Sequence, residues 1–114
     1  MVFVESRVFT RRLLALGEVI SEQVLSAIQV DLLDDPERGR LVPGLGGIRK
    51  ARTPNPGRGK GKRGGFRFLY MYLETRAHIH LFFLLDKNEQ EDASPEQRRA
   101  LREWAAQIKG ESGG

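Results

Sequence analysis

The sequence predicts one α+β domain, in which three helices pack against a mixed, antiparallel-rich sheet of about four strands. Segments with strand-type and helix-type patterns follow one another in the order βααβββα. Two helices between the first and second strands are long enough for a parallel crossover, whereas short connections make the later strands antiparallel neighbours. A chain of 114 residues is one domain by length. We expect the helices on one face of the sheet.

The N-terminal part is predicted to form a strand followed by two helices. Residues 2–4 are β-prone, and apolar residues near helical spacing indicate a first helix that ends before Gly17. Ser21 is expected to cap the second helix, because its hydroxyl can accept from free backbone N–H groups. The second helix carries an apolar stripe formed by Val24, Leu25, Ile28 and Leu32. Pro36 predicts its end, since the residue before a proline avoids helical backbone angles.

Three strands are predicted in the second half of the chain, at residues 48–52, 66–73 and 78–85. Residues 74–77 then form the turn between the last two strands. Residues 38–47 are expected to be an irregular crossing.

A basic loop and a C-terminal helix complete the prediction. Residues 53–62 contain two prolines and three glycines, which indicates a mobile loop. Ser94, Pro95 and Gln97 form the pattern of a capped helix start. We expect a single domain over residues 1–109 and a flexible tail over residues 110–114.

Charge is strongly segregated along the chain. The formal net charge is +4, but the segment between Glu37 and Glu74 contains no acidic residue and ten of the 19 Lys and Arg. These ten are Arg38, Arg40, Arg49, Lys50, Arg52, Arg58, Lys60, Lys62, Arg63 and Arg67. Clustered cations attract phosphates and release their counterions, so the segment predicts an anionic partner.

Several classes of protein are disfavoured by the composition. The chain has no cysteine, so it has no disulfide frame or thiolate zinc site, which fits a cytoplasmic protein. No apolar run approaches the roughly 20 residues that span a bilayer, so we expect no membrane association. The basic segment lacks the paired carboxylates of a two-metal nuclease. His78 and His80 share a strand face without a third ligand in register, which favours an ordinary histidine pair over a metal site.

Strand alternation predicts where the basic side chains gather. Lys50 and Arg52 lie on one face of their strand and Arg49 on the other. Arg67 opens a strand of large apolar residues, where an anion can reach it, because an unpaired cation is costly to bury. If the strands are neighbours, Lys50, Arg52 and Arg67 line one concave patch, joined by Lys60, Lys62 and Arg63 from the loop. Tyr70 is expected in the core or at its rim, and base stacking is the alternative.

Such a patch has the parts needed for RNA cleavage by a neighbouring 2′-hydroxyl. Arg and Lys can stabilise the negative charge that develops on the phosphate in the transition state. A lysine crowded by other cations can act as a base or an acid.

Three segments carry a resemblance to a known family. They are residues 44–52 (GLGGIRKAR), 59–70 (GKGKRGGFRFLY) and 87–89 (KNE). With residues 36–39 and the helix start at Ser94, they resemble the RelE/HigB group of toxins from bacterial type II toxin–antitoxin systems. The likeness extends from Val2 to Ile108.

The resemblance implies a small RelE-like fold and a ribosome-dependent mRNA endonuclease that stops translation. It also implies no cofactor or metal, and a complex with a small antitoxin of the helix-turn-helix type. The other partners would be the 70S ribosome and mRNA, in the cytoplasm.

Site residues carried over from the resemblance are all basic. Arg67 would stabilise the phosphate, Lys50 or Arg52 would help to activate the 2′-hydroxyl, and Lys87 would aid the leaving group. The remaining cations would hold RNA backbone: Arg49, Arg58, Lys60, Lys62 and Arg63. The chain departs from the pattern at Leu85, where family members often have a tyrosine, and at Asn88, where some have an arginine.

Two other functions remain open at this point. The ParE branch of toxins resembles this fold but poisons DNA gyrase. A non-catalytic nucleic-acid-binding module needs only the basic charge. The density of Lys and Arg on the second and third strands favours RNA cleavage over a gyrase-directed toxin, and the binding module stays open.

Overall fold

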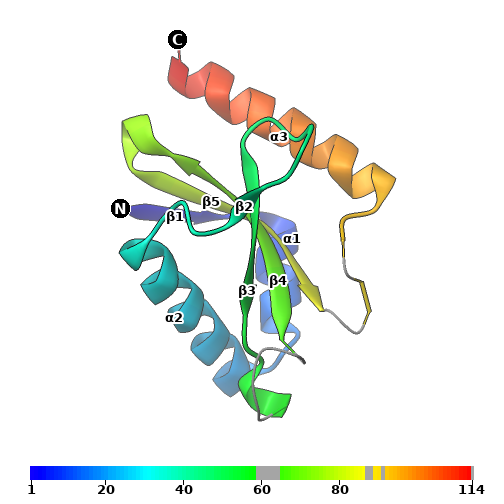
Figure 1. The fold of residues 1–114 in the computed structure, drawn as a ribbon. Helices are drawn as coiled ribbons and strands as arrows, with labels where there is room; N and C mark the ends of the chain where they lie inside the picture. Colours follow the sequence, from blue (N-terminus) through cyan, green and yellow to red (C-terminus); the bar gives the residue numbers. More distant parts are fainter. Residues whose placement is uncertain (59–64, 87–88, 91, 114) are drawn as a thin grey trace.

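The computed structural model describes residues 1–58, 65–86, 89–90 and 92–113. Its helices and strands follow the predicted order, with one short strand added (Figure 1). The strands are β1 (Val2–Glu5), β2 (Arg40–Leu41), β3 (Ile48–Thr53), β4 (Phe66–Leu73) and β5 (His78–Asp86). The helices are α1 (Arg7–Leu14), α2 (Glu18–Asp34) and α3 (Pro95–Gly113), with single 3-10 turns η1 (Pro56–Arg58) and η3 (Glu74–Arg76).

The sheet is mixed and mostly antiparallel, as predicted. Its strand order is β1-β5-β4-β3-β2. Only β1 and β5 run parallel among the strand pairs of the described sheet. They are not joined by a tight turn, since α1, α2 and three strands lie between them in the chain. The sheet has five described strands, since Arg40 and Leu41 pair with Lys50 and Arg49 inside the segment that was expected to be irregular.

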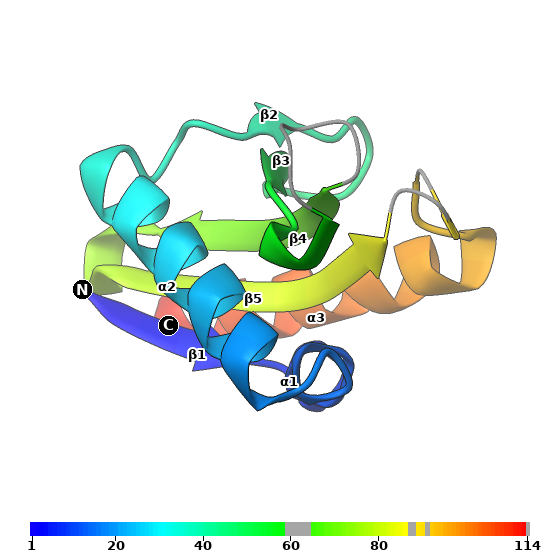
Figure 2. The ribbon, with the colours of Figure 1, turned by 90° about the horizontal axis from the view of Figure 1, so that it is seen from below.

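Helices cover both faces of the sheet, so the expectation of one covered face is wrong. Helices α1 and α2 lie on one side and α3 on the other, with the sheet between them (Figure 2). One core lies under α1 and α2 and includes Phe9, Ile28 and Phe68. The other lies under α3 and includes Leu69 and Leu101. Strands β4 and β5 are apolar on both faces, and each face needs its own cover.

The start of α2 differs from the prediction. Helix α2 begins at Glu18 with Gly17 at the cap, and Ser21 lies inside the helix, where its hydroxyl donates to the carbonyl of Glu18 at 3.0 Å. Gly17 has φ of 91°, which lets the chain turn directly from α1 into α2. The predicted Ser21 cap is therefore wrong, whereas the predicted end of the helix at Asp34 is confirmed.

The predicted capping motif of α3 is confirmed. The N–H of Ser94 donates to Oε1 of Gln97 at 2.8 Å, and the N–H of Gln97 donates to Oγ of Ser94 at 3.2 Å. This reciprocal pair satisfies two N–H groups at the helix start. Helix α3 extends to Gly113 and so includes residues that we assigned to the tail. The division into a domain and a flexible tail stays a prediction.

The described helices include none that is both long enough and apolar enough to cross a lipid bilayer.

Candidate nucleic-acid interface

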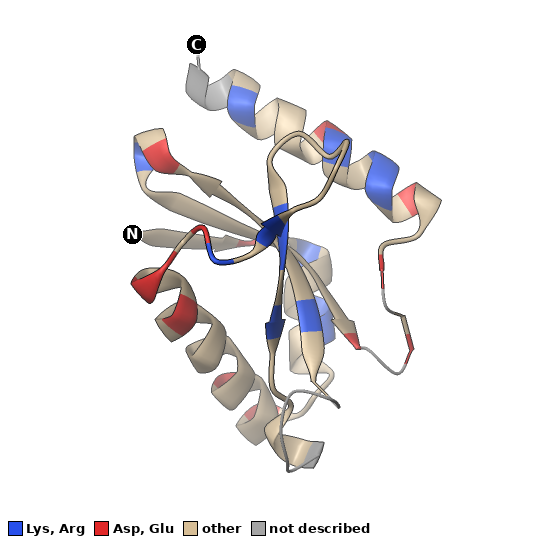
Figure 3. Ribbon diagram, in the orientation of Figure 1, with Lys and Arg blue, Asp and Glu red and all other residues tan. Residues whose placement is uncertain are grey.

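Basic side chains from three adjacent strands and the segment before them surround one cavity. The cavity measures about 520 Å³, and its described lining consists of Ala51 and five cations. These five form the cation cluster: Arg38, Arg40, Lys50, Arg52 and Arg67. Figure 3 shows Lys and Arg gathering where β2, β3 and β4 lie side by side, while Asp and Glu are spread along α2. The described lining contains no carboxylate.

Strand register builds the cation cluster. Arg52 of β3 lies opposite Arg67 of β4, and Lys50 of β3 lies opposite Arg40 of β2. Lys50 and Arg52 are two residues apart and so point to the same face. That face also carries Ile48 and Leu69, which pack under α3, so the cluster occupies a part of it that α3 leaves open. The structure thus brings Lys50, Arg52 and Arg67 together as expected.

Arg52 and Arg67 are like charges in directly opposite positions, which destabilises a sheet unless an anion binds. In the described part of the chain, neither forms an ion pair with a carboxylate. A pair of arginines held next to each other without an acid provides charge-assisted donors for a phosphate. This pair is therefore a candidate anion-binding feature of the cluster.

Two other members of the cluster have acidic partners. Nζ of Lys50 lies 3.1 Å from Oδ1 of Asp92, and Nη1 of Arg38 lies 3.1 Å from Oδ2 of Asp31. Both pairs are partly exposed, and exposed pairs contribute only about 0–1 kcal/mol. A phosphate can therefore replace either carboxylate at small cost. Asp92 was not a sequence candidate, because nothing in the pattern places the segment after β5 beside β3.

Arg49 lies outside the cation cluster. It occupies the other face of β3, and its guanidinium donates to the carbonyls of Glu37 and Gly39, at 3.0 and 2.7 Å. It also pairs with the carboxylate of Glu37 at 3.1 Å, and its side chain is only 18% exposed. The structure therefore shows Arg49 holding the segment before β2. A contact between Arg49 and RNA stays a prediction that requires these bonds to break.

Several predicted site residues lie outside the described residues. They are Lys60, Lys62, Arg63 and Lys87, together with the side chain of Arg58. The structure neither places them at the cation cluster nor excludes them from it. Leu85, where the family often has a tyrosine, is buried and lies opposite Arg67 in the sheet. It is part of the apolar core under α3.

Sequence analysis missed two members of the cluster, Arg38 and Arg40. Both belong to the acid-free segment that predicted an anionic partner. Arg40 was not a site candidate because β2 has only two residues, too few to show strand alternation, and Arg38 lies before β2, outside any strand. The acid-free segment itself was the available signal.

Tyr70 is a core residue, as predicted. Its side chain is fully buried on the face covered by α1 and α2. Its hydroxyl donates to the carbonyl of Pro36 at 2.8 Å and accepts from the N–H of Gly39 at 3.0 Å. Burial raises the pKa of Tyr70 above its ordinary value of 10.0. The phenol thus stays protonated and fixes the segment that leads into β2.

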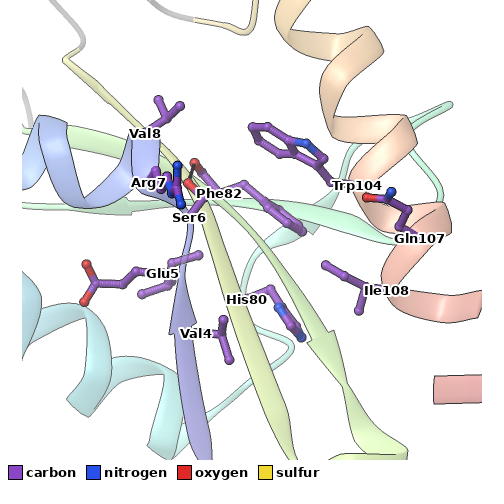
Figure 4. A pocket seen from close by; sticks show the side chains of 11 residues that line it. Val4, Glu5, Ser6, Arg7, Val8, His80, Phe82, Trp104, Gln107 and Ile108 are labelled. Atoms are coloured by element: carbon purple, nitrogen blue, oxygen red, sulfur yellow. Dashed lines mark hydrogen bonds between the residues drawn. The ribbon is translucent and has the colours of Figure 1, made fainter. Parts of the chain in front are cut away.

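His78 and His80 lie on β5 away from the cation cluster, and His80 lines a different, apolar cavity. Their ring centroids are 6.0 Å apart, and no three His, Asp or Glu side chains in the described residues are placed to hold a metal ion. His80, Phe82 and Trp104 line a cavity of about 330 Å³ between the edge strand β1 and α3 (Figure 4). Its lining is mainly apolar and shares no residue with the cation cluster.

Among solved structures, E. coli RelE is similar to this chain. A free-state mutant of E. coli RelE with two arginines replaced by alanine has a TM-score of 0.57 and 15% identity, over 94% of this chain and 95% of that chain. The isolated E. coli RelE toxin has a TM-score of 0.55 and 17% identity, over 90% and 97%. The chain has a RelE-like fold.

A toxin–antitoxin complex also contains a similar chain. The intact E. coli RelBE complex matches with a TM-score of 0.57 and 16% identity, over 80% of this chain and 98% of that chain. No protein-family model and no curated protein matches the sequence. The matches establish the RelE-like fold, and the cation cluster is the feature of this chain that bears on its chemistry.

Proposed function

We propose that the protein is the toxin of a type II toxin–antitoxin system and cleaves messenger RNA on the ribosome. One observation carries the proposal. Five cations surround a single cavity on strands β2 to β4 of a RelE-like fold, and the described lining of that cavity contains no carboxylate. An RNA phosphate is the anion that this arrangement fits, because several cations can contact its oxygens at once.

The proposed reaction is attack by the 2′-hydroxyl on the adjacent phosphorus. A bond forms between O2′ and phosphorus, and the bond between phosphorus and O5′ breaks. The products are a 2′,3′-cyclic phosphate and a 5′-hydroxyl end. The 2′-hydroxyl loses its proton to a base, and the leaving O5′ gains one from an acid. Negative charge grows on the phosphate oxygens in the transition state, where preorganised cations have their largest effect.

The cluster supports a division of roles among its residues. Arg67, with Arg52 directly opposite, is proposed to hold the scissile phosphate. Lys50 lies two residues from Arg52 on the same face, where its charge lowers the cost of deprotonating the 2′-hydroxyl. Lys87 is proposed to assist the leaving O5′. Lys60, Lys62, Arg63 and Arg58 are proposed to hold RNA backbone.

The described lining of the cavity supports the proposed dependence on the ribosome. That described lining has no aromatic side chain for stacking and no amide or carboxylate to read a base edge. Contacts to phosphate position RNA but carry no sequence information. A message therefore has to be presented to the cluster in a fixed register, and the 70S ribosome does so during decoding.

An antitoxin completes the proposal. The RelBE structure, similar in one chain, is a toxin–antitoxin complex. We assign the present protein a small helix-turn-helix antitoxin that keeps it inactive in the cytoplasm, where ribosomes and messages are found.

Replacement of Arg67 tests the proposal. Loss of a preorganised charge contact at a transition state lowers a rate by about 10²- to 10³-fold. Expression of the Arg67→Ala variant should therefore no longer arrest growth, although its circular dichroism matches that of the unmodified chain. Arg11 is exposed on α1 outside the cluster, and the Arg11→Ala variant should remain toxic.

The outcome against the proposal is equally clear. Full toxicity of a folded Arg67→Ala variant would remove the proposed catalytic residue. Growth arrest with DNA damage and intact messages would indicate a gyrase-directed toxin instead.

A further inference from the structure

Arg38 and Arg40 are the two members of the cation cluster that the proposed reaction does not use, and of these Arg38 is paired with Asp31. Arg40 lies on the two-residue edge strand β2, directly opposite Lys50, and its side chain is exposed. No ion pair of Arg40 with a carboxylate is found among the residues that the structure describes. Its exposed charge, opposite Lys50, is therefore open to an anion from outside the protein.

The cluster is arranged as a row across the sheet. Arg67 and Arg52 are opposite each other, Lys50 follows two residues along β3, and Arg40 is opposite Lys50. Opposite residues in an antiparallel pair are about 4.5–5.5 Å apart between Cα atoms. Alternate residues along a strand are about 6.6 Å apart. The two opposite pairs are therefore offset by two residues along β3 and by one strand across the sheet, so they present two separate sites for phosphates of one RNA strand.

The backbone beside Arg40 is fixed from the other face of the sheet. The N–H of Gly39 donates to the Tyr70 hydroxyl at 3.0 Å, and the carbonyl of Gly39 accepts from Arg49 at 2.7 Å. A Cβ atom at Gly39 would lie 2.9 Å from the Tyr70 ring and 3.0 Å from the carbonyl of Lys50, so the packing is close. These contacts keep the backbone that carries Arg40 in a defined place before any ligand arrives.

We propose that Arg40 and Lys50 form a second phosphate subsite, next to the scissile-phosphate site at Arg52 and Arg67. This inference rests on the proposed function, because it takes the ligand to be single-stranded RNA. The RNA backbone then crosses the sheet from β4 to β2, with successive phosphates on successive cation pairs. Arg40 is a positioning residue, which holds the neighbouring nucleotide and does not contact the reacting atoms.

Binding of short, uncleavable RNA tests the subsite without the ribosome. We would measure the affinity of 2′-O-methyl oligonucleotides with one, two or three phosphates by fluorescence anisotropy across a salt series. Each phosphate neutralised on a single strand contributes about 0.7 to the slope of log affinity against log salt. The Arg40→Gln variant should lose about 0.7 of this slope and up to about fivefold in affinity at low salt. This loss should occur only with ligands that carry two or more phosphates.

Two further variants serve as controls. Arg11→Gln removes the same charge from α1, outside the cluster, and should retain the full slope. Arg40→Lys retains the positive charge and should retain most of the salt slope. This result would attribute the loss in Arg40→Gln to the missing charge and not to a folding defect. An unchanged slope in Arg40→Gln, or an equal loss with the one-phosphate ligand, would overturn the subsite.

Failure of the subsite and failure of the proposed function give different results. If the unmodified protein cleaves translated messages while Arg40→Gln binds RNA normally, the subsite is wrong and the function stands. If the Arg40→Gln variant shows the predicted loss but the unmodified protein cleaves no message, the subsite stands and the proposed function is wrong.

Discussion

Tyr70 illustrates how a residue far from the chemistry supports the site. Its ring is fully buried under α1 and α2, while its hydroxyl bonds to Pro36 and Gly39 in the segment that leads to Arg40. The side chain thus connects the core to the edge of the cation cluster. Burial of the phenol keeps it neutral, since burial raises its pKa.

The Tyr70→Phe variant should unfold more easily. It leaves the buried N–H of Gly39 without its partner, and a lost partner in a buried hydrogen bond costs about 1–3 kcal/mol. Chemical denaturation at neutral pH measures this loss. Tyr72 forms no side-chain hydrogen bond within the described residues, so Tyr72→Phe should change the free energy of unfolding less. Equal effects of the two substitutions would contradict the assigned role of Tyr70.

The stability that the Tyr70 hydroxyl contributes should depend on pH. The folded pKa of Tyr70 is raised, so its contribution to stability is fully present below 10.0, its ordinary value. It is lost as pH rises through the folded pKa, because the unfolded phenol ionises first. The difference in stability between the unmodified protein and Tyr70→Phe should narrow above about pH 10.

At the residue scale, alternation in a strand was enough to predict that Lys50, Arg52 and Arg67 share a face. It was not enough to predict which of them has an acidic partner. The pair of Lys50 with Asp92 spans 42 positions along the chain, and its formation depends on where the segment after β5 runs. A local pattern contains no information about such a contact.

At the element scale, the segment between β5 and α3 brings Asp92 to the cation cluster. The same segment is also tied to α1 by the pair of Arg12 with Glu89 at 2.7 Å. The carboxylate of Asp92 occupies a position on Lys50 that a phosphate oxygen would take. Under the proposed function, the segment would therefore compete with RNA for one of the cluster's cations.

Removal of this carboxylate should strengthen RNA binding. Asp92→Asn abolishes the competing charge, and an exposed ion pair of this kind is worth up to about 1 kcal/mol. We expect affinity for uncleavable single-stranded RNA to rise by up to about fivefold. Glu22→Gln removes an exposed charge from α2 and should leave the affinity nearly unchanged. Weaker or equal binding by Asp92→Asn would mean that this pair holds Lys50 in place for the ligand.

Elements with strong local signals were predicted closely. Strand β4 has its predicted bounds, and α3 starts at its predicted cap. Strand β2 was missed because two residues show no period, and the α2 start was misplaced because Gly17 provides a cap without a side chain. Coverage of both sheet faces was missed although β4 and β5 are apolar on both sides, since the prediction followed the element order alone.

At the scale of the whole molecule, the cation cluster and the acidic residues of α2 lie on opposite faces of the sheet. The open part of the face under α3 carries the cation cluster, while acidic residues are spread along α2 on the opposite face (Figure 3). This separation orients the molecule in the field of a polyanion, which raises the rate of productive encounter at low salt. The acid-free segment of the sequence predicted this property before any strand was placed.

The central claim is that the cation cluster cleaves messages held in the ribosome. Mapping of transcript 5′ ends after expression of the chain tests it most directly. The account predicts new 5′-hydroxyl ends in phase with codons on translated messages, their absence when the start codon of a reporter is removed, and their absence with Arg67→Ala. Growth arrest without such ends, or the same ends with a folded Arg67→Ala variant, would contradict it.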